Sequence, residues 1–210
     1  MLEFLTIVLM LATAAWFANV GVFFAAVMWL SVWLAGLFAF CCFEPLASSL
    51  ERLLGPFADA VALVGLFCLG MVALRWARQG LVRQDIEFPI WVERSGGAIF
   101  GLLIGYSLAG LIFCVWQTLP VQERFLGYDL QHGVGLGGPE RMWLAAMHRA
   151  SRETLARADP AQEESYVFDP DASFVWRYAR YRRIAPGKTA PAVAREEFPF
   201  GPVYRPRSED

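Results

Sequence analysis

The feature that most constrains this chain is a run of forty residues, between Glu3 and Glu44, that contains no Asp, Glu, Lys or Arg. A helix needs about 20 apolar residues to cross a bilayer, so the run predicts two consecutive spans. Asn19–Gly21 is the natural break, because Asn is unfavourable in lipid and Gly permits a reversal of the backbone. We therefore expect spans at residues 2–18 and 22–43 joined by a tight turn. One long tilted helix is the alternative.

Two further spans follow. Glu44–Pro45 is expected to end the second span, since proline cannot continue a helix, and Gly55–Pro56 is expected to begin the next. The third span is predicted at residues 57–75. The fourth is predicted at residues 97–117, inside a second long stretch without charge. Between them lies a polar connection, which we interpret as an interfacial amphipathic segment interrupted at Pro89.

Charge separates the chain into two parts. Residues 1–122 hold twelve of the 38 charged residues, and residues 123–210 hold the other 26. This division predicts an all-α polytopic membrane protein, with a four-span transmembrane domain at 1–122 and a partly helical polar tail at 123–210. In the tail we expect helices near 139–158 and 170–184, followed by an extended C-terminus. The net charge of −2 argues against nucleic acid as a partner.

Small residues at four-residue spacing let membrane helices approach closely. Such spacing on the predicted second and fourth spans predicts two packing faces. The residues are Ser31, Ala35 and Ala39 on the second span, and Gly97, Gly101, Gly105 and Ala109 on the fourth. The spacing leaves open whether each face meets another span or another subunit.

The sequence contains no motif for catalysis or for holding a cofactor. The four cysteines all fall within predicted spans, and none stands in a C-x-x-C pair. The two histidines, His132 and His148, lack the spacing of a metal site. We therefore expect a protein that is not an enzyme and holds no metal or cofactor.

The second tail helix combines aromatic and basic residues in one short segment. This combination favours docking on a membrane surface or on an acidic protein, with a plain solvated helix as the alternative. The residues expected to dock are Phe174, Arg177, Tyr178, Arg180 and Tyr181.

The first 120 residues resemble the CvpA (colicin V production protein) family. The order of elements is similar: a short span, a glycine turn at Gly21, a long span, a third span, an amphipathic connection and a glycine-rich fourth span. The segment from Glu93–Arg94 through Gly97 to Gly101 is similar to the way the family begins its last span. The resemblance implies a protein of the bacterial inner membrane that supports the production or secretion of a peptide toxin and other envelope processes. It supplies no catalytic residues.

Three functional hypotheses follow. The first is a non-enzymatic CvpA-like protein that assembles with itself or with other membrane proteins in the lipid bilayer. The second is a small-solute channel or transporter, for which Asn19, Asp59, Ser107 and Gln117 are the polar candidates within the spans. The third is a membrane-anchored scaffold that acts through its tail.

The distribution of arginines predicts how the chain is oriented. Four arginines lie between spans three and four, whereas the opposite side carries only Arg52 and Arg124 near the membrane. Because positive residues favour the cytoplasmic side, both termini are expected to be extracytoplasmic.

Overall fold

The computed structural model describes residues 2–81, 88–119, 136–153, 157–158, 165–166, 174, 193–198 and 201–206. Its membrane half consists of α1 (Leu2–Val20), α2 (Val22–Leu54), α3 (Ala58–Leu81) and α4 (Ile90–Thr118), with a 3₁₀ turn, η1 (Gly55–Phe57), between α2 and α3. All four helices are long and apolar enough to cross a membrane. The prediction of an all-α membrane protein with four spanning helices is confirmed.

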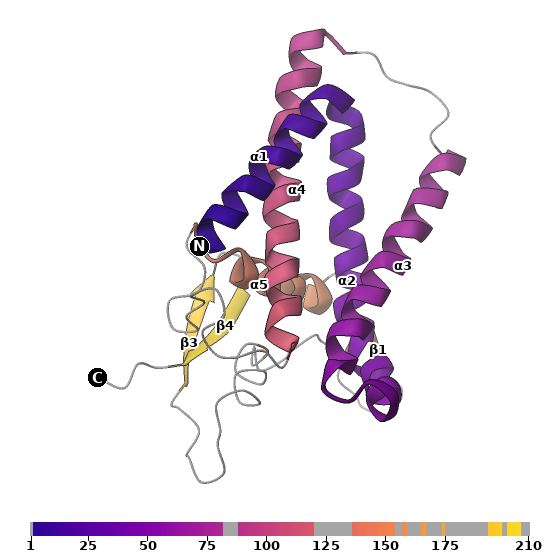
Figure 1. The fold of residues 1–210 in the computed structure, drawn as a ribbon, viewed down its shortest axis with the longest axis vertical. Helices are drawn as coiled ribbons and strands as arrows, with labels where there is room; N and C mark the ends of the chain where they lie inside the picture. Colours follow the sequence, from indigo (N-terminus) through magenta and orange to yellow (C-terminus); the bar gives the residue numbers. More distant parts are fainter. Residues whose placement is uncertain are drawn as a thin grey trace.

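The helices are arranged in the order α1, α4, α2, α3, because α4 packs between α1 and α2 while α3 packs against α2 (Figure 1). In this view α1 rises to a turn at the top, α2 descends, α3 rises again and α4 descends. The upper end of α3 leans away from the other helices. The helices α2 and α4 therefore form the centre of the bundle, with α1 on the outer side of α4 and α3 on the outer side of α2.

The turn between α1 and α2 consists of a single residue. Gly21 has a φ of 106°, a conformation that residues with a side chain rarely adopt, and its N–H still donates to the carbonyl of Phe17. This kink reverses the chain at the position that the sequence predicted, which excludes one long tilted helix.

The predicted end of the second span is wrong. Pro45 lies inside α2, which continues to Leu54 and ends only at Gly55. A proline removes one backbone N–H, here the helical donor to the carbonyl of Cys41, but it does not have to end a long helix. The hydroxyls of Ser48 and Ser49 both donate to the Pro45 carbonyl, at 2.9 and 3.0 Å, within the turn that follows.

The connection between the third and fourth spans is shorter than predicted. The helix α3 continues to Leu81, and α4 already begins at Ile90, with Pro89 in the position before its first residue. Pro89 therefore marks the start of a spanning helix. Residues 82–87 lie outside the described part of the chain.

The tail contributes one further helix and two short pairs of strands. The helix α5 (Pro139–Glu153) begins where predicted but ends before 158, because β1 (Arg157–Ala158) pairs antiparallel with β2 (Ser165–Tyr166) instead of continuing it. The C-terminal strands β3 (Val193–Phe198) and β4 (Gly201–Pro206) are extended, as predicted, and pair with each other.

The tail rests against the bundle. In Figure 1, α5 crosses the lower half of α4, and both β3 and β4 contact α5. Of the second predicted tail helix, only Phe174 belongs to the described residues, and it is helical.

Candidate functional site

The glycine face of α4 packs against α1 of the same chain. A Cβ added at Gly101 would stand 2.6 Å from the Cα of Ala14, and one at Gly105 would stand 2.6 Å from the Cα of Met10. At Gly97 it would overlap the carbonyl oxygen of Phe17. The two backbones are therefore in direct contact at three glycines spaced four residues apart, so this face of α4 meets α1 of the same chain and not another subunit.

The fourth member of this face, Ala109, continues the contact toward the lower end of the bundle. It is 2% exposed and forms a small cluster with Leu2 and Phe113, against which Leu9 packs. The contact thus runs from Phe17 to Leu2 along α1.

The small residues of α2 have two different environments. Ala35 and Ala39 are buried, and a Cβ added at Gly70 of α3 would lie 3.2 Å from both the Cα and the Cβ of Ala35. Ser31 is half-buried, and its hydroxyl donates to the carbonyl of Val27 at 2.7 Å. The Ala35 position is therefore the close contact between α2 and α3.

The residues that carry the family resemblance gather at the upper end of the bundle. A Cβ added at Gly21 would lie 3.8 Å from Oε1 of Glu93, so the start of α4 touches the turn between α1 and α2. This places a carboxylate close to the N-terminus of α2, where the helix dipole favours negative charge. Arg94, the next residue, is exposed, while Gly97 and Gly101 lie one and two turns further into the contact with α1.

A second site of close packing, which the sequence did not predict, joins the bundle to the tail. Trp143 of α5 is 3% exposed and inserts between α2 and α4. A Cβ added at Gly36 would lie 2.8 Å from its Cη2, and one added at Gly110 would lie 2.9 Å from its Cβ. These two glycines leave the space that the Trp143 side chain occupies, because a side chain at either position would displace it.

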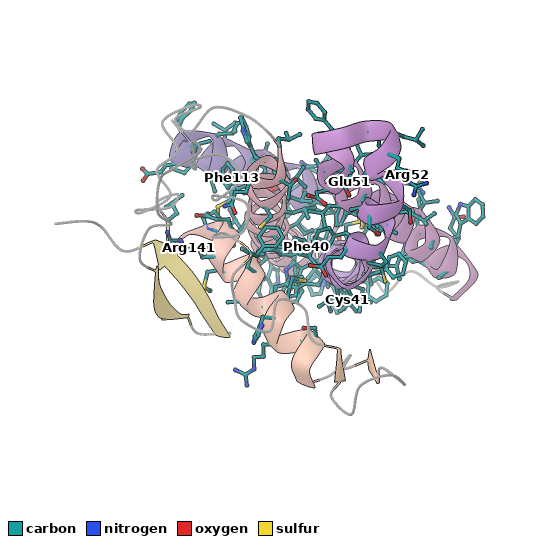
Figure 2. All side chains as sticks on the ribbon, turned by 90° about the horizontal axis from the view of Figure 1, so that it is seen from below. Phe40, Cys41, Glu51, Arg52, Phe113 and Arg141 are labelled. Atoms are coloured by element: carbon teal, nitrogen blue, oxygen red, sulfur yellow. The ribbon has the colours of Figure 1, made fainter. Side chains whose placement is uncertain are left out.

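Aromatic rings continue this contact in both directions. Trp143 lies 5.2 Å from Trp33 and 6.4 Å from Phe40, measured between ring centroids. Phe174 of the tail is 2% exposed and lies 5.9 Å from Phe40 and 6.3 Å from Phe43. Separations of this size are favourable for aromatic pairs. Seen from the lower end, Phe40 lies at the centre of the side chains that fill the bundle (Figure 2).

Of the predicted tail-docking residues, Phe174 therefore packs against the chain's own bundle. The other four, Arg177, Tyr178, Arg180 and Tyr181, lie outside the described residues.

Polar groups accompany α5 where it meets α4. The thiol of Cys114 donates to the backbone carbonyl of Glu140 at 3.7 Å, and the hydroxyl of Tyr106 donates to the carbonyl of Leu136 at 3.3 Å. The Glu140 side chain is fully buried, and its Oε1 lies 4.0 Å from Nε of Arg141, which is also buried. A charge that lies so deep requires close partners, so the first turn of α5 is fixed by polar as well as apolar contacts.

The polar candidates for a solute path do not come together. Asn19 lies at the upper end, where its Nδ2 donates to the carbonyl of Ala15, whereas Asp59 lies in the first turn of α3 at the lower end. Ser107 and Gln117 are buried on α4, three turns apart in sequence. Within the described ranges, no three His, Cys, Asp or Glu side chains are grouped as a metal site would require, and Cys41, Cys42, Cys68 and Cys114 are free thiols.

The two ends of the four spanning helices differ in charge. The charged residues that the structure describes at the upper end are Arg75, Arg78, Glu93 and Arg94. Those at the lower end are Glu3, Glu44, Glu51, Arg52 and Asp59. Among the described residues of these four helices, basic side chains therefore prevail at the upper end and acidic side chains at the lower end. Figure 2 shows Glu51 and Arg52 on the side of the lower end opposite Arg141.

The sequence did not predict the roles of Gly36, Gly110 and Trp143, because none of them fits the four-residue spacing that reveals the other contacts. Gly110 follows Gly105 by five residues, and Gly36 stands beside the Ala35 stripe. For Trp143 the sequence offers only the amphipathic pattern of residues 139–153, which indicates a helix with one apolar face but not the element on which that face packs.

Comparison with known proteins adds no relative: no protein family, no curated protein and no solved structure matches the chain.

Proposed function

We propose that this chain is a non-enzymatic protein of the bacterial inner membrane, similar to the CvpA family, that supports the secretion of peptide toxins and other envelope processes. The observation that carries the proposal is the convergence of the resembling residues. Gly21 and Glu93 are more than seventy positions apart in sequence yet adjacent in space, and Gly97 and Gly101 seat α4 on α1 directly below them. A chance similarity in scattered residues would not be expected to gather at one corner of the fold.

The proposed orientation places the upper end in the cytoplasm and both termini outside. The difference in charge between the two ends supports it, because an excess of arginine marks the cytoplasmic side. Among the described residues of the spanning helices, three of the four arginines lie at the upper end. A reporter enzyme that is active only outside the cytoplasm, fused after residue 210, is expected to be active. An inactive fusion of the same abundance would overturn the orientation.

The glycine face of α4 is filled by α1 of the same chain, so we place assembly with a second copy or with another membrane protein elsewhere. We assign it to the outward face of α3, which is one of the exposed apolar faces of the bundle. This helix packs mainly on α2, and its exposed side chains include Val61, Leu69, Val72 and Trp76.

Secretion of a peptide toxin by a strain that lacks its own member of this kind tests the proposal. The wild-type chain is expected to restore export. A Gly101→Leu variant, in which α4 cannot seat on α1, is expected to fail. Ala12→Leu is the matched control, since Ala12 is exposed on α1 and lies away from the α3 face. If neither the wild-type chain nor the control changes export while both reach the membrane, the proposal is wrong.

The scaffold hypothesis has one specific observation in its favour, namely that the tail is anchored to the bundle through Trp143 and Phe174. Deletion of residues 123–210 separates the two hypotheses. If export survives the deletion, the tail is not the working part. The transporter hypothesis has less support, because its four polar candidates lie apart.

A further inference from the structure

We propose that the basic end of the bundle binds anionic phospholipid headgroups through Arg75, Arg78 and Arg94. The inference requires only that the four helices cross a bilayer, and it goes beyond the proposed role in secretion. It rests on the depth of these arginines, on the geometry that holds Arg78, and on the contrast with the opposite end.

The depth of the arginines places them at the surface of the hydrocarbon. Arg78 follows Ala58, at the lower end of α3, by twenty residues, which at 1.5 Å per residue is about 30 Å. Arg94 precedes Cys114 of α4, which meets α5 at the lower end, by the same number of residues and thus about the same distance. The hydrocarbon of a typical bilayer is about 30 Å thick. When one surface lies at the lower ends of these helices, the arginines lie at the other.

The guanidinium of Arg78 is held in place and still has donors to offer. Its central carbon lies 4.3 Å from the centroid of the Phe24 ring, at the start of α2. A ring that covers the face of a guanidinium leaves the N–H groups at its edge pointing outward in the plane. Those groups match a phosphate in the two-pronged manner that lysine cannot provide.

The neighbouring residues suit a headgroup as well. Arg75 lies one turn before Arg78 and is exposed, as is Arg94. Trp76 and Trp91, which are 72% and 73% exposed, occupy the same end, where indole rings favour the headgroup region. In the part of the chain that the structure describes, no carboxylate forms an ion pair with any of the three arginines.

The lower end supplies the contrast that makes the binding specific to one leaflet. Its spanning helices carry four acidic side chains and a single arginine, Arg52, in the last turn of α2. The charges of the spanning helices therefore attract anionic lipids more strongly at the upper end than at the lower end. We expect anionic lipid to be enriched mainly around the upper end.

The test uses the full chain in bilayers of phosphatidylcholine, either alone or mixed with phosphatidylglycerol. Native mass spectrometry of the chain released from the mixed bilayers counts the lipids of each kind that stay bound. The wild-type chain is expected to retain phosphatidylglycerol in preference, and to lose the preference as salt is raised. Soluble glycerol phosphate is expected to compete poorly, because it lacks the acyl chains. Equal retention of the two lipids would overturn the proposal.

Variants locate the site. Each arginine changed to Gln is expected to reduce the preference about fivefold, and Arg75→Gln/Arg78→Gln/Arg94→Gln together about a hundredfold. The matched control is Arg52→Gln at the lower end, which is expected to leave the preference unchanged. An Arg52 variant that loses as much as the triple variant would overturn the assignment to the upper end.

Two further measurements separate the role of charge from that of orientation. A triple Lys variant keeps the charge but not the two-pronged contact, and it is expected to retain part of the preference, between those of the wild type and the triple Gln variant. If it loses as much as the Gln variant, the electrostatic basis is wrong. The proposed orientation fails separately, since a reporter that places the C-terminus in the cytoplasm would refute the orientation while the lipid preference persists.

Discussion

Replacing Gly101 with Ala should separate α1 from α4. The new Cβ would stand 2.6 Å from the Cα of Ala14, whereas ordinary contact begins near 3.4 Å. Since the Cβ is fixed by the backbone of one helix and the Cα belongs to the backbone of the other, no side chain can turn away, and the helices must move apart by about 1 Å. A gap of that size forfeits a quarter to a half of the dispersion energy of each contact it affects, and overpacking of this kind costs about 1–3 kcal/mol.

The opposing term is the higher helix propensity of alanine, worth about 1 kcal/mol. Gly65→Ala on α3 gains the same helix propensity without a clash, because that position is exposed and a Cβ there has nothing within 4 Å. The difference in stability between the two variants therefore reports the clash at Gly101 alone. The Gly101 variant should therefore be less stable than the Gly65 variant by about 2 kcal/mol, or roughly thirtyfold in the unfolding equilibrium constant.

The assay is reversible unfolding in mixed detergent micelles, followed by the loss of helical circular dichroism. Because the contact lies within one chain, the difference between the variants should not change with the ratio of protein to detergent. If the two variants unfold together, the backbone contact between α1 and α4 contributes nothing. If the difference disappears on dilution, the glycine face joins two subunits instead.

Three other changes have expected outcomes. Trp143→Ala should release the tail and cost about 3–5 kcal/mol of the docking free energy, seen as faster proteolysis of the tail. Trp76→Ala, at an exposed position, should leave the cleavage rate unchanged, and equal rates for the two variants would show that Trp143 does not hold the tail. Gly21→Ala, at a φ of 106°, should destabilise the folded chain by about 1–3 kcal/mol in the same unfolding assay, and a neutral effect would show that the turn relaxes. Pro45→Ala should stabilise the chain by up to about 3 kcal/mol, since α2 already continues through this position, and a loss of stability would mean that the proline is needed there.

The sequence predicted the spans well because charge and apolar length are properties of single segments. The forty uncharged residues require two helices whatever they pack against, and Gly21 is one of few residues that can join them in one step. The end of α2 was harder to predict, because whether a helix continues through a proline such as Pro45 depends on how the helix is packed and not on the proline alone.

The candidate site was predictable only in part. Spacing revealed that Gly97, Gly101 and Gly105 form a face, but the partner of a face is a property of two elements and not of one. The Trp143 contact could not be predicted, since Gly36, Gly110 and Trp143 lie on three elements, and no periodicity relates them. Phe174 was predicted to dock, but the aromatic pattern of its helix says nothing about which rings receive it.

The pairing of α1 with α4 also bears on how the chain is made. The helix α1 is synthesised well before its partner α4, because the glycine face that seats it begins about eighty residues later. At typical rates of synthesis this delay is roughly 4–16 s. During that time the face of α1 that will contact the α4 glycines, around Met10, Ala14 and Phe17, is exposed to lipid or to the insertion machinery. The helices α2 and α3 can already pair. The contact of α1 with α4 therefore forms late. Until α4 is made, the described contacts that hold α1 are those with α2, namely the turn at Gly21 and the pair of Phe17 and Phe24 rings.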